Sequence, residues 1–354
     1  MDTFRGKTIL VTGGTGSLGK TLVKRFLSLK RGKPKKIIVF SRDEAKQHYM
    51  RLDYQHKKHA TDEVIYNNFK SMVGFRIGDI RNYHSVLSAL KDVDIVINTA
   101  ALKQVPSCEY FPYEATQTNV MGAANIVQVL RENDLKVKTV VGVSTDKACK
   151  PVNVMGITKA LQERIFISGN ILVPKTRFIC VRYGNVLASR GSVIPLFHDQ
   201  IKKGGPVTIT TEDMTRFLLP LEKAVDTIFA AIAAAKPGEI FIPKVPSSLI
   251  TNIAKALIGE RKIKIKVTGI RPGEKIHEIL VSDEEAWHTV KRGDYFAIKP
   301  MLPEIVSRPK EKAVLKGEYS SAAFLMDEKQ TLQMLKKYNL LLEQNNDFEN
   351  EMLR

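Results

Sequence analysis

Short apolar runs alternate with amphipathic stretches through the first half of the chain. The apolar runs, each long enough for one buried strand, cover residues 7–12, 36–40, 73–77, 94–98 and 139–143. The stretch after the first run carries apolar side chains at helical spacing, namely Leu18, Leu22, Phe26 and Leu29. Apolar strands that alternate with helices indicate a parallel sheet covered on both faces. Because crossover connections are right-handed, we predict an α/β fold with a doubly wound, Rossmann-like sheet.

The regular alternation ends near residue 190, and turn residues then divide the chain into shorter pieces. Glycine, proline and serine interrupt the pattern at residues 204–206, 237–238 and 246–248. We predict a Rossmann-like domain at residues 1–190, whose sheet gains a further strand near residues 239–243. Residues 191–324 are predicted to form mainly a smaller α/β lobe over the strand ends. Residues 325–354 are predicted to form a C-terminal helix and tail.

Composition limits the class of protein. Of the 354 residues, 44% are hydrophobic and 26% are charged, so the chain can bury a full core and is not disordered over most of its length. The longest apolar run, residues 228–235, is too short to span a bilayer, and the N-terminus lacks the apolar stretch of a signal peptide. Three cysteines (Cys108, Cys149 and Cys180) are too few and too scattered for a disulfide scaffold or a zinc site. We expect a cytoplasmic protein without a bound metal.

The net charge of +18 favours an anionic partner. Nucleic acid, an anionic membrane surface and anionic small ligands all meet that condition, and the charge alone does not choose among them. The densest basic cluster, at residues 30–36, lies between a predicted helix and a predicted strand and is interpreted as a solvated loop. Because no nucleic-acid-binding motif accompanies it, we expect neither nucleic acid nor a membrane as partner.

A glycine-rich turn follows the first predicted strand. Residues 12–19 read Thr-Gly-Gly-Thr-Gly-Ser-Leu-Gly and open the first predicted helix. At this position Gly13 permits a tight turn, Gly16 lets the backbone approach a pyrophosphate and Gly19 lets the helix pack closely on the strand. The helix N-terminus offers N–H groups and a positive dipole end to the phosphates. We predict that a dinucleotide binds this turn through Gly13, Thr15, Gly16, Ser17, Leu18 and Gly19.

The end of the second predicted strand distinguishes NADP from NAD. An acidic residue there would bind the ribose 2′-hydroxyl of NAD, but the chain has Ser41, Arg42 and Asp43, with Lys46 one turn further on. A hydroxyl, a guanidinium and an ammonium group suit the 2′-phosphate of NADP. The alternative is that Arg42 is only surface charge, and Asp43 can cap the next helix in either case. After the third strand, Asp79 either accepts a hydrogen bond from the adenine amino group or caps a helix.

An acid and a base stand side by side after the fifth predicted strand. Residues 144–147, Ser-Thr-Asp-Lys, lie at the sheet edge where doubly wound folds bind their ligands. If they are buried together, Asp146 and Lys147 can be tuned for proton transfer near neutral pH. The alternative is a salt-bridged loop without a catalytic role.

Together with further motifs, these segments resemble the extended short-chain dehydrogenases/reductases over residues 7–319. Within them, the chain is similar to the configuration-inverting UDP-N-acetylglucosamine 4,6-dehydratases of flagellin-glycan, capsule and O-antigen sugar pathways. The resemblance rests on residues 12–19, 41–44, 78–79, 100–106, 118–119, 144–147, 182–185, 189–193, 214–217 and 269–275. It implies an NADP-dependent lyase whose first domain binds the cofactor and whose smaller lobe binds a UDP-sugar. It also implies a homo-oligomer.

One position departs from the superfamily pattern of Tyr, three residues and Lys. Met155 occupies the Tyr position, and Lys159 is in place. A thioether has no proton to exchange, so the usual phenolate base is absent. The capsule-type members that this chain resembles also carry Met there. The resemblance therefore narrows to a Met-for-Tyr subgroup that makes a 4-keto-6-deoxy-L-arabino sugar nucleotide.

The resemblance implies an internal redox cycle. A hydride leaves carbon 4 of the sugar for NADP⁺, water leaves from carbons 5 and 6, and the hydride returns to carbon 6. A neutral Lys147 is expected to remove the carbon-5 proton and a protonated Asp146 to protonate the departing hydroxyl. Lys159 is expected to hold the nicotinamide ribose and to add positive charge near the 4-oxygen. Either Thr145, through a water, or Lys147 would take the proton of the 4-hydroxyl group.

The resemblance also assigns ligand contacts. Further NADP contacts are expected from Ile80, Ala100, Val186, Leu187, Ala188, Ser189 and Arg190, and UDP-sugar contacts from Lys103, Asn185, Val193, Thr210, Arg271 and Glu274. The planar fork of Arg271 suits a diphosphate, although Arg271 and Glu274 could equally be a surface pair. Two other functions stay open. One is a nucleotide-sugar 4-epimerase, which needs no acid at carbon 6, and the other is an NADP-binding protein without turnover, which Met155 favours.

Overall fold

The computed structural model describes residues 3–55, 60–187, 192–306 and 311–342. Its centre is a nine-stranded sheet in the order β13-β14-β9-β6-β5-β4-β1-β2-β3. Neighbouring strands from β3 to β9 are parallel, whereas β14 and β13 join the sheet antiparallel. The order 3-2-1-4-5-6 confirms the predicted doubly wound, Rossmann-like fold. The strands are β1 (Thr8–Thr12), β2 (Lys36–Ser41), β3 (Val73–Ile77), β4 (Ile95–Asn98), β5 (Thr139–Thr145), β6 (Arg177–Tyr183), β9 (Ile240–Pro243), β13 (Thr289–Arg292) and β14 (Tyr295–Ile298).

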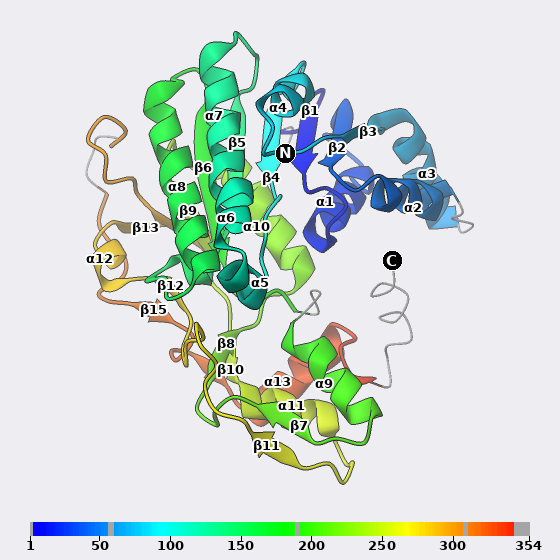
Figure 1. The fold of residues 1–354 in the computed structure, drawn as a ribbon, viewed down its shortest axis with the longest axis vertical. Helices are drawn as coiled ribbons and strands as arrows, with labels where there is room; N and C mark the ends of the chain where they lie inside the picture. Colours follow the sequence, from blue (N-terminus) through cyan, green and yellow to red (C-terminus); the bar gives the residue numbers. More distant parts are fainter. Residues whose placement is uncertain (1–2, 56–59, 188–191, 307–310, 343–354) are drawn as a thin grey trace.

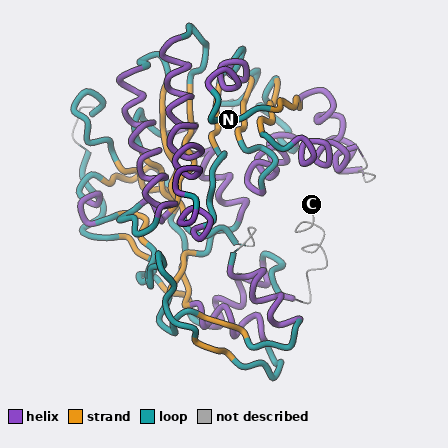
Figure 2. Tube along the Cα trace, in the orientation of Figure 1, coloured by secondary structure: helices purple, strands orange, loops and turns teal. Residues whose placement is uncertain are grey.

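Helices cover both faces of this sheet (Figures 1 and 2). On one face α7 packs against α4 and α8, and on the other α1 packs against α3 and α10. Both α8 and α10 contact β5 and β6, one from each side. These helices, with α2 beside α3, are α1 (Ser17–Leu27), α2 (Glu44–Gln55), α3 (Ala60–Met72), α4 (Tyr83–Leu90), α7 (Gly122–Glu132), α8 (Val154–Leu172) and α10 (Leu221–Ala234).

The main core follows the apolar pattern of the sequence. Every residue of β1 and of β4 is buried. Leu22 and Phe26 of α1 have no exposed surface, and Leu18 and Leu29 are partly buried against the same core. Burial of such side chains contributes roughly 1.5–3 kcal/mol each, which fixes α1 against the sheet and aims its N-terminus at the sheet edge.

A second apolar core lies in a smaller lobe at the bottom of Figure 1. Helix α11 packs there against α9 and α13, beside the β7–β11 pair and a three-stranded sheet in the order β16-β10-β8. The elements of this lobe are β7 (Val207–Ile209), β8 (Thr215–Phe217), β10 (Ser247–Leu249), β11 (Ile265–Val267), β16 (Leu325–Met326), α9 (Val193–Lys202), α11 (Ile250–Ile258) and α13 (Glu328–Lys337).

The small lobe is interleaved with the main sheet along the chain. Strand β9 returns to the main sheet, as predicted for residues 239–243. Helix α10 and strands β13 and β14 fall within the segment predicted mainly as lobe, yet their apolar side chains belong to the main core. Conversely, α13 comes after residue 324, and its Leu335 is fully buried in the lobe core. Apolar faces decide both placements, because β9 completes the parallel sheet beside β6 and α13 covers α11. The division at residues 190 and 324 therefore describes neither core fully.

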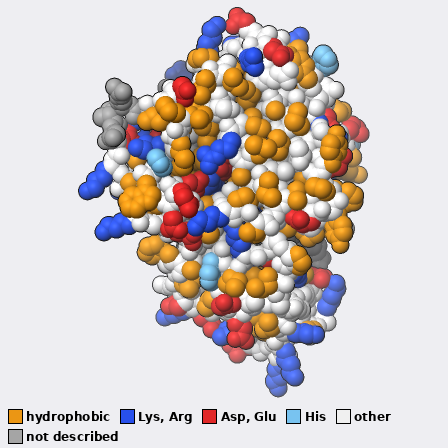
Figure 3. Space-filling view, turned by 60° about the vertical axis from the view of Figure 1, so that its left-hand side comes forward, with side chains coloured by type: hydrophobic (Ala, Val, Ile, Leu, Met, Phe, Trp, Pro, Cys, Tyr) orange, Lys and Arg blue, Asp and Glu red, His pale blue; other side chains and the backbone are white. Residues whose placement is uncertain are grey.

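Seven further short elements complete the described structure. They are α5 (Val105–Tyr110), α6 (Pro112–Ala115), η1 (Thr116–Met121), η2 (Asp146–Ala148), β12 (Ile279–Val281), α12 (Asp283–Ala286) and β15 (Tyr319–Ser320). Figure 3 shows apolar side chains spread among charged ones on one face of the molecule. The expected homo-oligomer stays a prediction. Across the described ranges, no helix is both long and apolar enough to cross a bilayer.

Candidate active site

A cleft of about 1650 Å³ is lined by residues of both cores. On the main-sheet side its wall comes from the residues that follow β1, β2, β3, β4, β5 and β6. On the lobe side it comes from α9, from β7 and from the loop at residues 271–274. The carboxyl edge of a doubly wound sheet is where this fold binds ligands, so the cleft is the candidate active site.

The glycine-rich turn forms a backbone cradle in the wall of this cleft. Gly13 has a φ of +63°, and a Cβ atom there would lie 2.9 Å from the backbone of Ala100. A Cβ atom on Gly19 would lie 2.5 Å from Gly14, so only glycine allows the helix this close to the turn. Helix α1 begins at an N-cap, Gly16, that supplies no side-chain hydrogen bond, which leaves first-turn N–H groups to an anion. The cradle fits the pyrophosphate of a dinucleotide.

The end of β2 places the predicted phosphate-binding residues together at the cleft. Asp43 Oδ1 accepts a hydrogen bond of 2.9 Å from the Lys46 backbone N–H, so Asp43 caps α2. Its other oxygen pairs with Lys46 Nζ at 2.7 Å. Ser41 Oγ accepts from Gln47 at 3.0 Å. The side chain of Arg42 is 51% exposed, so its guanidinium can turn towards an anion at this corner.

Asp79 is held by two arginines. Its carboxylate accepts hydrogen bonds of 2.9 Å from the backbone N–H and from Nε of Arg81, and Arg42 Nη1 lies 3.7 Å away. Burial alone would raise the pKa of Asp79, but hydrogen bonds from Arg81 outweigh it and lower that pKa. Helix α4 is capped by Asn82, so the cap predicted as an alternative for Asp79 is wrong. Asp79 still lines the cleft, where its carboxylate could face an adenine.

The amine of Lys147 lies between two carboxylates. Its Nζ is 3.2 Å from Asp146 Oδ1 and 3.0 Å from Glu278 Oε1, and it donates to Asn185 Oδ1 at 3.3 Å. Lys147, Asn185 and Glu278 all line the cleft. Sequence reasoning missed Glu278, although it stands three residues after the motif at 269–275. The structure thus joins the predicted acid–base pair, a predicted substrate residue and one further carboxylate.

Charges set the protonation of this cluster. Burial alone would lower the pKa of Lys147, but the carboxylates of Asp146 and Glu278 outweigh it and raise that pKa. Lys147 is therefore an ammonium ion here, which differs from the neutral base expected from sequence, because two carboxylates face it rather than one. Burial, together with the charge of Glu278, raises the pKa of Asp146 despite the nearby Lys147. That direction favours the protonated acid that was expected.

Two predicted site residues do not line the cleft. Asp146 is fully buried, and its Oδ1 accepts a hydrogen bond of 2.9 Å from Thr145 Oγ1. Thr145 and Lys147 do line the cleft, so a proton can reach Asp146 only through its neighbours. Leu187 packs in the lobe core and does not line the cleft, and its backbone N–H donates to the Leu219 carbonyl at 2.8 Å. The expected contacts of Ala188, Ser189 and Arg190 lie outside the described residues.

Lys159 and Met155 stand on successive turns of α8 in the cleft wall. Lys159 Nζ donates to Gln162 Oε1 at 2.6 Å, and Gln162 in turn donates to the carbonyl of Val143. Burial lowers the pKa of Lys159 to about 8. Met155 is 6% exposed and packs with Cys108 and Ala115. The position therefore offers an apolar thioether to the cleft and no exchangeable proton.

The predicted substrate residues of the lobe lie together on the opposite wall. Thr210 Oγ1 donates to Glu274 Oε2 at 3.2 Å, and Arg271 Nη1 lies 4.0 Å from Glu274 Oε1. Lys103 and Val193 also line the cleft. Arg271 is 60% exposed, so its fork is accessible to a diphosphate and is only loosely paired with Glu274.

Several buried oxygens in the cleft wall fit a polar ligand. Within the described part of the chain, five cleft-lining side chains have a buried oxygen without a hydrogen-bond partner: Thr118, Ser144, Tyr183, Ser192 and Glu278. Leaving a buried polar group unpaired costs about 1–3 kcal/mol. A dinucleotide and a sugar, both rich in hydroxyl and amide groups, can pair these oxygens. The residues present therefore fit a nicotinamide dinucleotide with a sugar substrate.

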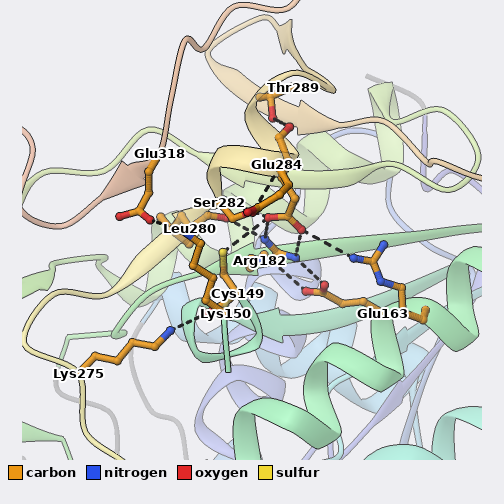
Figure 4. Close-up of polar contacts among 12 residues, drawn as sticks. Cys149, Lys150, Glu163, Arg182, Lys275, Leu280, Ser282, Glu284, Thr289 and Glu318 are labelled. Carbon is orange, nitrogen blue, oxygen red and sulfur yellow. Dashed lines mark hydrogen bonds and ion pairs between the residues drawn. The ribbon is translucent and has the colours of Figure 1, made fainter. Parts of the chain in front are cut away.

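A buried arginine, Arg182, forms a hydrogen-bonded cluster next to the turn that carries Lys147 (Figure 4). Arg182 of β6 donates two hydrogen bonds to Glu163 of α8, at 3.0 and 2.7 Å, and two to Glu285 of α12, at 2.7 and 2.9 Å. Its Nη1 also donates to the carbonyl of Leu280. Cys149, just after η2, donates its thiol to Glu285 at 3.6 Å. Its carbonyl accepts from Lys275 at 2.6 Å. Arg182 thus links α8, through Glu163, to α12, through Glu285, and to Leu280, which follows Glu278 by two residues. Glu285 in turn accepts from Cys149, just after the turn of Lys147.

Comparison with known proteins places the chain among sugar-nucleotide enzymes. A family described as polysaccharide biosynthesis protein matches residues 9–300. A protein of Rickettsia bellii named UDP-glucose 4-epimerase is 47% identical over 301 residues, 83% of either chain. A protein of Campylobacter jejuni named UDP-N-acetylglucosamine 4,6-dehydratase (inverting) is 43% identical over 302 residues, 84% of either chain. The solved structure of Pen from Bacillus thuringiensis shares 34% identity with a TM-score of 0.84, covering 96% of this chain and 99% of that one.

Proposed function

The chain belongs to the polysaccharide biosynthesis protein family, and from that premise we propose that it is a nucleotide-sugar dehydratase that uses NADP. The proposed reaction is 4,6-dehydration of UDP-N-acetylglucosamine with inversion at carbon 5, giving a UDP-4-keto-6-deoxy-L-arabino-hexose for glycan synthesis. The observation that carries the proposal is the Asp146–Lys147–Glu278 cluster in the cleft that also holds the dinucleotide cradle.

The same cluster favours dehydration over 4-epimerisation. Epimerisation at carbon 4 needs hydride removal and return but no acid for a departing hydroxyl. A buried carboxyl with a raised pKa, Asp146, supplies such an acid. Met155, in contrast, removes the phenol on which epimerases of this fold rely. The name of the Campylobacter jejuni relative agrees with this proposal, whereas that of the Rickettsia bellii relative supports the alternative.

Proton transfer is the part of the reaction that the chain's own residues would perform. Residues 13–19, with Ser41 and Arg42, would hold NADP, whose chemistry there would be acceptance of the carbon-4 hydride and its return to carbon 6. Thr145, through a water, or Lys147 would take the proton of the 4-hydroxyl group. Lys147, which lines the cleft, would first release its ammonium proton to water there and would then take the proton of carbon 5. Asp146 would protonate the departing hydroxyl through the hydroxyl of Thr145, which lies 2.9 Å from its carboxyl. Lys159 would add positive charge near the 4-oxygen, and Arg271 would pair with the diphosphate.

Product analysis tests this function directly. Incubation with UDP-N-acetylglucosamine in D₂O should give deuterium at carbon 5, because a solvent-exchanged group replaces that proton, while one carbon-6 hydrogen stays substrate-derived. Proton NMR at the earliest time should show L-arabino couplings. A galacto product would mean epimerisation, and an unchanged substrate would mean binding without turnover. A D-xylo product at the earliest time would mean retention at carbon 5 and would remove the inverting assignment.

Cofactor choice gives a separate prediction. We expect Arg42→Ala to weaken NADPH binding far more than NADH binding, because only NADPH carries the 2′-phosphate. A charge-assisted contact contributes about 1.5–3 kcal/mol, or roughly ten- to a hundred-fold in affinity. Fluorescence titration of both cofactors measures it. The matched control is Arg51→Ala, an exposed arginine of α2 outside the cleft, which should leave both affinities unchanged. Equal losses for the two cofactors in Arg42→Ala would make Arg42 merely structural.

A further inference from the structure

Lys147 shares its charge between two carboxylates that differ in their surroundings. Glu278 Oε1 lies 3.0 Å from Lys147 Nζ and 3.8 Å from Arg216 Nε. Asp146 Oδ1 lies 3.2 Å from the same Nζ, and within the described residues no other cation is paired with Asp146. Glu278 and Asp146 are both buried, with 2% and 0% exposure. The single ammonium group is therefore closer to Glu278, which a second cation also faces.

The second oxygen of Asp146 is buried away from any hydrogen-bond donor in the described part of the chain. Asp146 Oδ2 and Glu278 Oε2 are both buried without a hydrogen-bond partner among the described residues, but only Glu278 has a second cation, Arg216, facing its other oxygen. A Cβ atom on Gly184 would lie 3.0 Å from Asp146 Oδ2 and 2.6 Å from the side chain of Phe217. An ionised oxygen there would lose its hydration without gaining a donor, whereas a protonated carboxyl tolerates the site. The other cation nearby, Lys275, donates to the carbonyl of Cys149 at 2.6 Å.

We propose that Glu278 is a positioning residue of the acid–base cluster, which holds the Lys147 ammonium group at the cleft and keeps a proton on Asp146. Glu278 does this by pairing with the positive charge that would otherwise stabilise an ionised Asp146. The catalytic consequence rests on the proposed function, whereas the proton on Asp146 is a property of the free protein.

The carboxylate of Glu278 shifts the pKa values of two neighbours, Asp146 and Lys147, in the same direction. The negative charge of Glu278 raises the pKa of Asp146 and also that of Lys147. The other charged groups that face the pair are Arg216 and Lys275. Removing the charge of Glu278 should therefore lower both pKa values. Asp146 would lose its proton at lower pH, and Lys147 would become neutral at lower pH.

Glu278→Gln tests this in the full-length protein, because the amide keeps the shape and the acceptor oxygen but not the charge. The two limbs of the pH profile of kcat/KM report the pKa values of the acid and of the base. Both limbs should move to lower pH, by about 1–3 units for a charge this close, with KM little changed. A lower but unshifted profile would overturn the proposal, since a merely structural role changes amplitude without moving either limb.

A substrate-free readout separates this inference from the proposed function. The infrared difference between wild type and Asp146→Asn isolates the protonated carboxyl band of Asp146, and a pH titration follows its loss. That band should vanish at lower pH in the Glu278→Gln background. If it vanishes at the same pH in both backgrounds, the proposal is wrong whatever the enzyme makes. If it shifts as expected and UDP-N-acetylglucosamine is unchanged, the role of Glu278 stands while the proposed function fails.

A surface ion pair of similar length serves as the matched control. Lys150 Nζ lies 2.9 Å from Glu318 Oε2, at a partly exposed position away from the cleft. Glu318→Gln removes one carboxylate from a lysine in the same way. It should leave the Asp146 band and both limbs of the profile unmoved. A shift as large as that of Glu278→Gln would mean that net charge, and not Glu278, sets the proton on Asp146.

Discussion

Lys147→Ala is expected to lose turnover almost completely while the protein still binds NADPH. Loss of a general base typically costs ~10²–10⁴-fold in rate, and Lys147 is the only amine among the described residues that contacts both Asp146 and Glu278. The cradle for the dinucleotide is formed by residues 13–19, which the substitution does not touch. A turnover assay and a fluorescence titration with NADPH measure the two properties independently.

The neighbouring turn supplies a control for this experiment. Lys150 lies three residues on, is exposed, and pairs with Asp283 and Glu318. Lys150→Ala should keep turnover near the wild-type value. Retention by Lys147→Ala of more than about a tenth of wild-type turnover would remove Lys147 as the base, given the size of the effect expected for that role.

Arg182→Ala is expected to destabilise the protein more than any surface substitution. The guanidinium is 1% exposed and donates to two glutamates that are themselves buried, Glu163 and Glu285. Removing one partner from a buried ion cluster leaves uncompensated charge and costs about 3–5 kcal/mol, a large part of the roughly 5–15 kcal/mol that stabilises a folded protein. Urea unfolding and calorimetry measure the loss.

The pH dependence identifies the cause of that loss. Burial alone would raise the pKa of Glu285, but Arg182 outweighs it and lowers that pKa. A depressed pKa stabilises the fold above the unfolded value of about 4.3 and loses that contribution as the pH falls. The stability gap between wild type and Arg182→Ala should therefore narrow at acid pH. A gap that stays constant with pH would instead indicate lost packing. Lys203→Ala, which breaks an exposed pair of 2.8 Å with Asp199, should cost at most about 1 kcal/mol.

Sequence patterning predicted the main fold well because its strands are apolar throughout. In β1 and β4 every position is buried, so the run of apolar residues and the strand coincide. The same reasoning returned β9 to the main sheet but left α10, β13 and β14 in the segment assigned mainly to the small lobe. Helix α10 contains residues 228–234 of the apolar run at 228–235. Which core it covers depends on β5 and β6, far earlier in the chain. The spacing of apolar residues identifies the apolar face of a helix but not the element that packs against that face.

The sequence identified those site residues that lie together in one short segment of the chain. The cradle at residues 12–19 and the pair of Asp146 and Lys147 are local in sequence. Glu278 was missed because its role comes from a contact made across the fold, in a loop whose own residues carry no catalytic pattern. The expected neutral state of Lys147 failed for the same reason. The sequence places only Asp146 beside Lys147, whereas the fold adds Glu278, the second carboxylate that raises the pKa of Lys147.

The late position of α13 has a consequence for biosynthesis. The apolar side of α11 is covered by α13, whose Leu335 is fully buried, and β10 gains its second neighbour only with β16. A ribosome adds roughly 5–20 residues per second from the N-terminus, so strands β1–β6 can pair well before either partner emerges. We expect the nascent chain to complete its nucleotide-binding half first. The small lobe would then wait with an exposed apolar helix, a natural target for chaperones, until α13 is synthesised.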